Sequence, residues 1–205
     1  MTSRKQHWEQ LYTNKSSHEV SWYQTEPRWS LELIHRSGLG KDAPIIDVGG
    51  GASLLVDRLR AEGYRQLAVL DISGAALEVA RQRLAAQAAD IEWFEADVTQ
   101  FIAPHPFSLW HDRAVFHFLT AAEDQRCYVE VLNRTLISGG QVIIAAFAIG
   151  GPTRCSGLNI VQYDAAKLMA ELGPNFHLEE DLTETHLTPA GREQRFGFFR
   201  LRKLD

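Results

Sequence analysis

Hydrophobic positions along the chain follow two spacings that predict alternating strands and helices. Short apolar runs, which predict buried strands, occur at 45–48, 67–71, 91–94, 107–110 and 141–147. Between and after these runs, apolar side chains three or four residues apart predict helices at 54–61, 75–88, 123–136 and 165–172. Such alternation is typical of a parallel sheet with helices on both faces.

The C-terminal part of the chain departs from this alternation. Two strand-like runs, 176–179 and 195–201, follow one another without an obvious helix between them. They predict an antiparallel hairpin at one edge of the sheet. The predicted fold class is therefore α/β, a doubly wound, Rossmann-like sheet of seven strands, mostly parallel with a C-terminal antiparallel hairpin.

The first 43 residues are polar and aromatic, and they predict helices at 5–12 and 28–37. Trp8 and Tyr12 are four residues apart and therefore share one face of the first helix. We expect residues 1–43 to form a helical and aromatic cap on a Rossmann-like core, 44–205, within a single domain of 1–205.

Composition limits the class of protein and its partners. The 205 residues carry a formal net charge of -5 without any long run of basic side chains, so we expect no nucleic-acid partner. No apolar stretch is long enough to span a bilayer, and the polar start has no apolar core of a secretory signal. The two cysteines, Cys127 and Cys155, lack metal-ligand spacing. These features predict a cytoplasmic protein without a metal or a membrane partner, as a monomer or weak homodimer.

The strand at 45–48 ends in the sequence Asp47-Val48-Gly49-Gly50-Gly51. Glycines allow a tight turn and let a ligand approach the backbone closely. Twenty residues after Gly51, Asp71 ends the next strand, where a carboxylate can accept hydrogen bonds from ribose hydroxyls. Ligands of such sheets bind beyond the carboxyl ends of the strands, so this edge is the predicted site.

Two classes of cofactor use such a turn. A dinucleotide requires a third glycine, but that position is Leu54. Asp47, just before the glycines, would repel a pyrophosphate and would suit a cationic amino-acid group. The pattern hydrophobic-Asp-x-Gly-x-Gly resembles motif I of the class I S-adenosylmethionine-dependent methyltransferases.

The resemblance continues in order along the chain. It includes Asp71-Ile72-Ser73, Glu95-Ala96-Asp97-Val98, the segment 107–113 and the turn at 136–140. It implies S-adenosyl-L-methionine as cofactor, with S-adenosyl-L-homocysteine as product. It also implies roles for particular residues. The glycines and Asp47 would frame the methionine end of the cofactor, and Asp112 and Arg113 would lie beside it. Asp71 would bind the ribose, with Ile72 beside it. The adenine would be surrounded by Ala96, Asp97 and Val98. Asp97 could instead only cap a following turn.

Methyl transfer requires a base only if the acceptor atom carries a proton at working pH. The candidates after the fourth predicted strand are His111, Asp112 and His117. The alternatives are that Asp112 only pairs with Arg113 and that His117 only packs in a helix. The aromatic residues Trp8, Tyr12 and Trp22 are candidates to close over the sulfonium by cation–π attraction, or else to pack as core.

The loop at 150–163 follows the fifth predicted strand at the same edge, where loops commonly set substrate choice. Within it, Arg154 could pair with an acidic substrate or be solvated, and Cys155 could be a reactive thiol or inert packing.

Segments outside the motifs bear on the methyl acceptor. The sequences HWEQLY and SWYQ are similar to those of small bacterial methyltransferases related to the citrate synthase lysine methyltransferase type. That likeness implies a protein side chain or a small molecule as acceptor. The size and the aromatic N-terminal segment also resemble the thiopurine and tellurite methyltransferases, which leaves a sulfur-like acceptor open. Competing functions are a nicotinamide-dependent oxidoreductase and a non-catalytic S-adenosylmethionine-binding module.

Overall fold

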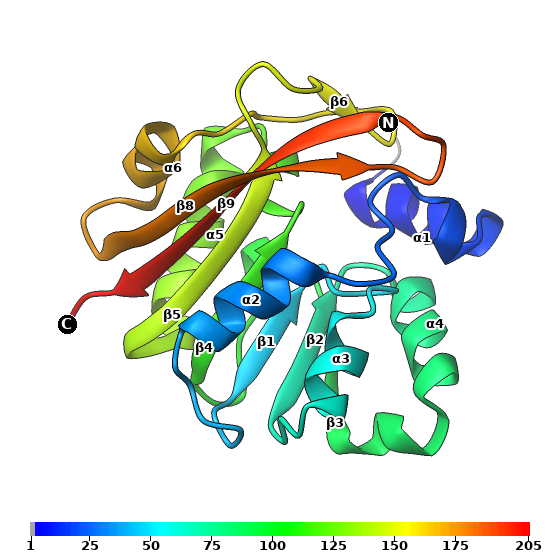
Figure 1. Ribbon diagram of the computed structural model, residues 1–205, viewed down its shortest axis with the longest axis horizontal. Helices are drawn as coiled ribbons and strands as arrows, with labels where there is room; N and C mark the ends of the chain where they lie inside the picture. Colours follow the sequence, from blue (N-terminus) through cyan, green and yellow to red (C-terminus); the bar gives the residue numbers. More distant parts are fainter. Residues whose placement is uncertain (1–2) are drawn as a thin grey trace.

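The computed structural model describes residues 3–205, and within that range seven strands form one sheet in the order β3-β2-β1-β4-β5-β9-β8 (Figure 1). Neighbours from β3 to β5 pair parallel, whereas β5–β9 and β9–β8 pair antiparallel. The predicted fold class and its C-terminal hairpin are confirmed. The strands are β1 (Ile45–Val48), β2 (Leu67–Asp71), β3 (Ile91–Glu95), β4 (Phe107–Arg113), β5 (Leu136–Phe147), β8 (Phe176–Leu187) and β9 (Glu193–Lys203).

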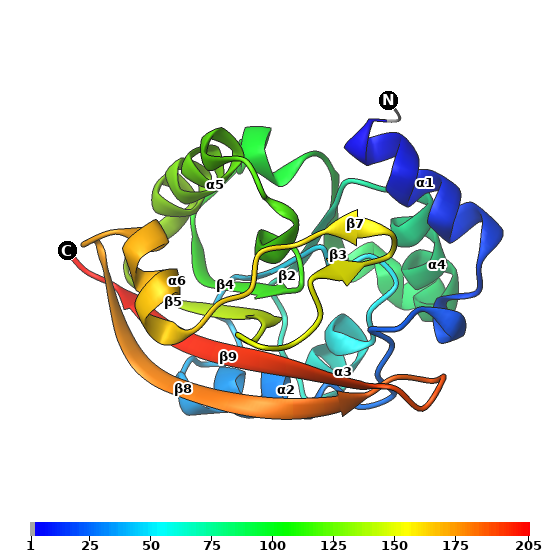
Figure 2. The same ribbon diagram turned by 90° about the horizontal axis from the view of Figure 1, so that it is seen from above.

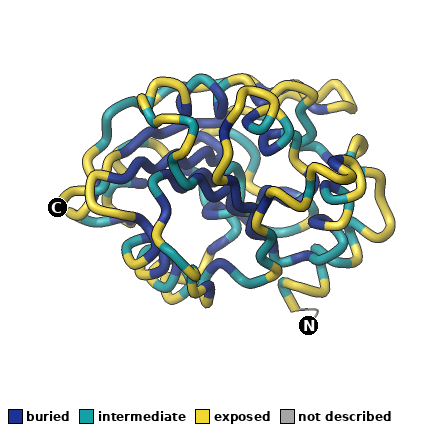
Figure 3. The backbone as a smooth tube through the Cα atoms, turned by 90° about the horizontal axis from the view of Figure 1, so that it is seen from below, coloured by how far each residue is buried: buried dark blue, intermediate teal, exposed yellow. Residues whose placement is uncertain are grey.

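Helices cover both faces of this sheet because its central strands alternate buried side chains between the two sides. In β2, Leu67 and Val69 face one hydrophobic cluster, and Ala68 and Leu70 face the other. The first cluster contains apolar residues of α2 (Arg28–Arg36), α3 (Leu55–Ala61) and α4 (Gly74–Leu84). The second contains those of α5 (Ala122–Thr135) and α6 (Ala165–Leu172). The buried stretches follow the central strands (Figure 3).

Several predicted boundaries are wrong for local reasons. The helix predicted at 75–88 ends at Leu84, because Ala85 adopts a φ of 51° and a 3-10 segment, Ala85–Asp90, follows. The first C-terminal strand extends to Leu187, far beyond the predicted 176–179. Its continuous pairing with β9 holds polar side chains in the strand, which a search for apolar runs does not detect.

The loop predicted at 150–163 contains a small antiparallel hairpin that the sequence pattern did not predict. It consists of β6 (Arg154–Cys155) and β7 (Leu158–Asn159). In Figure 2 this hairpin lies over the end of the sheet, near α1 (Arg4–Asn14). The edge at which the cofactor motifs were expected is therefore covered from two sides.

Helix α1 is attached to the core largely by polar side chains, since none of its residues is buried. Glu9 accepts hydrogen bonds from the Ser73 hydroxyl and the Ala75 backbone N–H at the start of α4. Arg4 pairs with Asp124 of α5 at 2.6 Å. By contrast, α2 buries Leu31, Leu33 and Ile34 in the core. Residues 1–2 of the predicted cap lie outside the described residues.

Within residues 3–205, no helix combines the length and the apolar character that a membrane crossing requires.

Candidate active site

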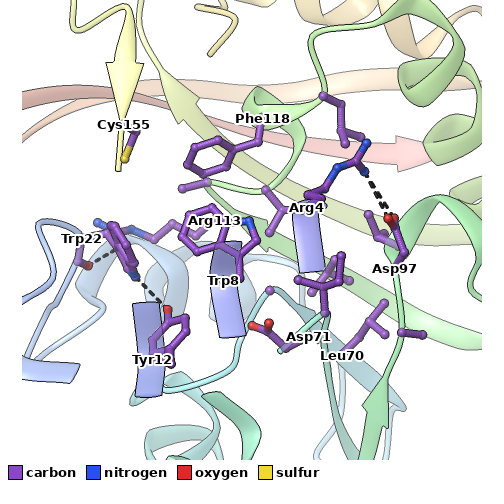
Figure 4. Close-up of a pocket in the computed structure, with 18 of the residues that line it drawn as sticks. Arg4, Trp8, Tyr12, Trp22, Leu70, Asp71, Asp97, Arg113, Phe118 and Cys155 are labelled. Atoms are coloured by element: carbon purple, nitrogen blue, oxygen red, sulfur yellow. Dashed lines mark hydrogen bonds and ion pairs between the residues drawn. The ribbon is translucent and has the colours of Figure 1, made fainter. Parts of the chain in front are cut away.

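The parallel strands β1 to β4 bring four chain segments to one edge of the sheet, where they surround a cavity of about 820 Å³, part of it open to solvent (Figure 4). The position agrees with the general rule for ligands of such sheets. Ten residues predicted to bind the cofactor line this cavity: Trp8, Tyr12, Trp22, Gly49, Asp71, Ile72, Ala96, Asp97, Val98 and Arg113.

The glycine turn after β1 has a distinct requirement at each position. Gly49 adopts a φ of +68°, and a Cβ there would collide with the Val115 side chain. At Gly50 and Gly51 a Cβ would collide with the carboxylates of Asp47 and Asp71, respectively. The turn thus leaves room for the two acids as well as for a ligand, and of the three glycines only Gly49 lines the large cavity.

Asp47 is buried under the turn and is held by a histidine. Its Oδ1 lies 2.7 Å from Nδ1 of His111, and Nε2 of His111 lies 2.8 Å from the hydroxyl of Ser30 on α2. Both ring nitrogens of His111 are therefore engaged. This chain of contacts joins β1, β4 and α2.

A second cavity of about 570 Å³ adjoins this chain of contacts. Asp47, Gly50 and His111 line it. The two cavities share Tyr12, Trp22, Gly49 and Arg113.

Asp71 ends β2 and lines the large cavity with a carboxylate that is almost completely buried. Burial raises its pKa to about 7; the backbone N–H groups of Ser73 and Ile72 act in the opposite direction, and the charges of Asp47 and Glu9 add to the rise. Its Oδ1 accepts a hydrogen bond from the Ser73 N–H at 2.9 Å. Ser73 also caps α4, because its hydroxyl oxygen accepts a hydrogen bond from the Ala76 N–H.

Asp97 lies at the opposite end of the cavity from Trp22 and Cys155 (Figure 4). It caps the short 3-10 segment Val98–Gln100 by accepting from the N–H and the hydroxyl of Thr99. It also pairs with Arg4 of α1 at 3.3 Å. Asp97 therefore caps a turn and lines the cavity at the same time.

Asp112 does not line either cavity, contrary to the expectation that it lies at the reaction centre. Its carboxylate is completely buried and accepts three hydrogen bonds, from the backbone N–H groups of Val115 and Phe116 and from the hydroxyl of Tyr128. Burial raises its pKa to about 6, while these donors hold it down. Asp112 fixes the turn after β4. The alternative, a pairing of Asp112 with Arg113, is also absent from the hydrogen bonds and ion pairs within residues 3–205.

His117 is likewise buried and lines neither cavity. Its ring packs against Phe118 and Phe147, and its Nδ1 lies 3.4 Å from the Phe147 N–H. Burial, together with the charge of Arg113, lowers its pKa to about 3. This is the packed arrangement that was the alternative to a base.

The imidazole of His117 is expected to stay neutral throughout the working pH range. In an NMR titration, its ring signals should not move between pH 8 and about 5, because protonation would place an unpaired charge in the core. A His117 midpoint between pH 6 and 7 would contradict this assignment.

Arg113 ends β4 with its guanidinium inside the protein. One Nη1–H donates to the backbone oxygen of Trp22 at 2.8 Å, and the group lies over the Phe196 ring at 4.9 Å. Within residues 3–205, its Nε and Nη2 have no hydrogen-bond partner although both are buried. Burial lowers its pKa to about 10, so the group remains charged at neutral pH.

The N-terminal aromatic residues form one wall of the cavity. Trp8 packs edge-on against Trp22 and Phe118, with ring centroids 5.7 and 4.9 Å apart. The Trp22 indole N–H donates to the Tyr12 hydroxyl at 3.2 Å. These side chains are thus both packed and cavity-lining.

Sequence reasoning missed several cavity residues. Arg4 belongs to a helix whose pattern marked only Trp8 and Tyr12. Phe147 and Phe196 lie in predicted strands, but the apolar pattern does not indicate which side chains of a strand reach the cavity. The missed lining residues are Arg4, Val48, Leu70, Ala114, Val115, Phe118, Leu119, Phe147 and Phe196.

The order of strands and the acids at their ends define a nucleoside-binding class of doubly wound proteins. Residues 45–140 match the family model described as "Methyltransferase domain". The structure is similar to that of the N-methyltransferase NodS from Bradyrhizobium japonicum WM9 in complex with S-adenosyl-l-homocysteine, with a TM-score of 0.75, 17% identity and 98% of each chain covered. Residues 45–140 are thus similar to a methyltransferase domain, and the fold is one that S-adenosylmethionine-dependent methyltransferases have.

Two other similar proteins mark the range of this fold. The chain is 26% identical over 170 residues to "eEF1A lysine and N-terminal methyltransferase" of Danio rerio; the match covers 82% of this chain and 23% of that protein. The chain thus spans about a quarter of the length of this curated relative. The [4+2]-cyclase SpnF has a TM-score of 0.70 at 14% identity, with 97% of this chain and 91% of SpnF covered. At this identity the likeness is one of fold alone.

Proposed function

We propose that this chain transfers a methyl group from S-adenosyl-L-methionine to an acceptor. The single observation that carries the proposal is one cavity reaching from Asp97 past Asp71 to Gly49, and on to an aromatic end at Trp22 and Phe196. This length of cavity suits a nucleoside joined to a further group. The family match supports the same assignment.

The cofactor's parts are assigned by the chemistry of the lining. We assign the adenine to Ala96, Asp97 and Val98, and the ribose to Asp71 beside Ile72. We assign the methionine end to the second cavity near Gly49, Gly50 and Asp47, where a carboxylate suits its ammonium group. Gly51 contributes through the space it leaves for Asp71.

The sulfonium then lies beside the aromatic wall. Trp8, Tyr12 and Trp22 present ring faces and edges there, and an aromatic face attracts a cation. When bound, the cofactor supplies an electrophilic methyl group. The residues of this chain orient that group and exclude water, which accounts for much of the rate in a displacement of this kind.

We assign no general base to Asp112, His111 or His117. The carboxylate of Asp112 is fully occupied by three donors, and both nitrogens of His111 are engaged. His117 is neutral within the core. Their positions support structural roles in all three cases.

The proposal is tested by calorimetry and by methyl transfer. The purified protein is expected to bind S-adenosyl-L-homocysteine and not NAD, and to transfer label from methyl-labelled S-adenosyl-L-methionine to a component of cell extract. Tight binding of NAD without binding of S-adenosyl-L-homocysteine would establish an oxidoreductase instead. Binding of the cofactor without transfer to any protein or small-molecule fraction would favour a non-catalytic module.

Affinity for S-adenosyl-L-homocysteine is expected to depend on pH through Asp71. Ribose hydroxyls donate to an ionised carboxylate, and the free carboxyl has a pKa of about 7. Affinity should therefore be maximal above pH 7 and fall by up to about tenfold per pH unit below it. Calorimetry between pH 5.5 and 8.5, with Asp71→Asn as the variant that should lose this dependence, measures it. An affinity that rises on acidification would contradict the assignment of Asp71 to the ribose.

A further inference from the structure

The end of the cavity farthest from Asp97 has aromatic walls and one charged group. Phe118, Phe147 and Phe196 line it, together with Trp22 and the thiol of Cys155. Figure 4 shows Trp22 and Cys155 across the cavity from Asp97. These residues come from β5, β6, β9, the turn after β4 and the N-terminal segment before α2, whereas the proposed adenosine residues follow β2 and β3. This end is therefore free to hold a methyl acceptor.

The charged group at this end is Arg113, whose guanidinium is only partly satisfied. It gives one hydrogen bond to Trp22 and lies over Phe196, and its Nε and Nη2 are buried without a partner within residues 3–205. Buried donors without acceptors are costly and uncommon in folded proteins. A ligand with an anionic acceptor atom would remove that cost.

No carboxylate lines this end of the large cavity within residues 3–205. Within residues 3–205, the only carboxylates that line the large cavity are Asp71 and Asp97, at the adenosine end, and no histidine lines it. The carboxylates of Glu184 and Asp47 act on Arg113 electrostatically, but neither forms an ion pair with it. Burial raises the pKa of the Cys155 thiol to about 11, so it is neutral at physiological pH. Among the described residues, Arg113 is thus the charged side chain on the wall of the acceptor end, and it disfavours an ammonium group there.

We propose that the methyl acceptor is a small, flat, apolar molecule that carries an anionic thiolate or carboxylate, and that Arg113 binds this anion. The inference rests on the proposed methyl transfer. It replaces the expectation that Arg113 binds the cofactor, and it disfavours a lysine side chain. An ammonium group would meet Arg113 here without a carboxylate or a base to accept its proton.

The reaction with such an acceptor balances without a base. A lone pair of the anion forms the bond to the methyl carbon, and the bond between that carbon and the sulfonium sulfur breaks. The electron pair of the broken bond stays on that sulfur. A thioether or an ester and S-adenosyl-L-homocysteine result, one positive and one negative charge disappear, and no proton moves. The absence of a positioned base among the described cavity residues agrees with this chemistry.

The experiment is a matched series of probes titrated calorimetrically into the protein saturated with S-adenosyl-L-homocysteine. Benzoate, benzyl alcohol and benzylamine share one ring and differ in charge. Benzoate is expected to bind about tenfold or more tightly than the other two, since charge-assisted hydrogen bonds are stronger than neutral ones. With labelled S-adenosyl-L-methionine, thiophenol, as its thiolate, should be methylated, and benzylamine should not.

Variants of Arg113 distinguish its effect on acceptor binding from its effect on cofactor binding. Arg113→Gln should weaken benzoate binding by about tenfold or more, a larger factor than its effect on S-adenosyl-L-homocysteine, and Arg113→Lys should retain most benzoate binding. Exposed Arg192→Gln is the matched control and should change neither affinity. The charge series on the unaltered protein does not depend on any variant folding.

Any of three results would overturn the inference. One is preferential binding or methylation of benzylamine, and another is the absence of benzoate binding to the saturated protein. A third is an Arg113→Gln variant that loses S-adenosyl-L-homocysteine and keeps benzoate. Failure of the unaltered protein to bind S-adenosyl-L-homocysteine is a separate outcome, which would defeat the proposed function itself.

Discussion

Replacing Asp71 by alanine is expected to weaken binding of S-adenosyl-L-homocysteine by about 1.5–3 kcal/mol, or roughly 10- to 150-fold. The buried carboxylate at the end of β2 lines the cavity, and its Oδ1 accepts a hydrogen bond from the Ser73 N–H. We assign the two ribose hydroxyls to this group, and loss of charge-assisted hydrogen bonds in a buried site carries this cost. Isothermal titration of the folded variant measures it.

Two further variants make this result specific. Asp71→Asn keeps the size of the side chain and loses its charge, so its affinity should lie between those of the unaltered protein and Asp71→Ala. Asp90→Ala removes an exposed aspartate that pairs only with Arg60 on the surface, and it should bind as the unaltered protein does. Unchanged affinity in a folded Asp71→Ala variant would remove Asp71 from the cofactor site.

Replacing Asp112 by alanine is expected to lower the free energy of unfolding by about 3–5 kcal/mol. The change leaves three buried donors without an acceptor: the N–H groups of Val115 and Phe116 and the hydroxyl of Tyr128. Chemical denaturation followed by circular dichroism measures the loss. Asp112→Asn, which keeps one acceptor oxygen, should lose less.

Asp181→Ala is the control for Asp112, because Asp181 is exposed on the edge strand β8. Its unfolding free energy should change by less than about 0.5 kcal/mol. A small loss of stability in Asp112→Ala, combined with a large loss of cofactor affinity, would return Asp112 to the reaction centre.

The sheet and the convergence of the strand-end residues on one cavity were predictable because both depend on simple regularities. Parallel strands place successive carboxyl ends at one edge, so residues after β1, β2 and β3 had to converge. Gly49, Asp71 and Asp97 all line the same cavity for this reason. Helix ends and the length of β8 were not predictable, since a backbone angle at Ala85 and the pairing with β9 decide them.

None of the candidate bases lines the large cavity, and for the two in β4 the reason is geometric. Side chains in a strand alternate between faces, so in β4 His111 and Arg113 point away from the face that Asp112 occupies. The structure places His111 against Asp47 and Ser30, and it places Asp112 against Tyr128. A motif that contains acids and histidines does not specify which of them meets solvent or ligand.

By itself, the sequence determined the doubly wound fold, the glycine turn and the acids that follow each strand, because these depend on periodicity and on spacing along the chain. Only the tertiary structure decided how the acceptor end is built. Trp22, Phe147, Cys155 and Phe196 come from four distant segments, and their packing leaves Arg113 with unpaired buried donors. No local pattern encodes such a meeting, because it depends on where the cap and the β6–β7 hairpin come to lie over the edge of the sheet.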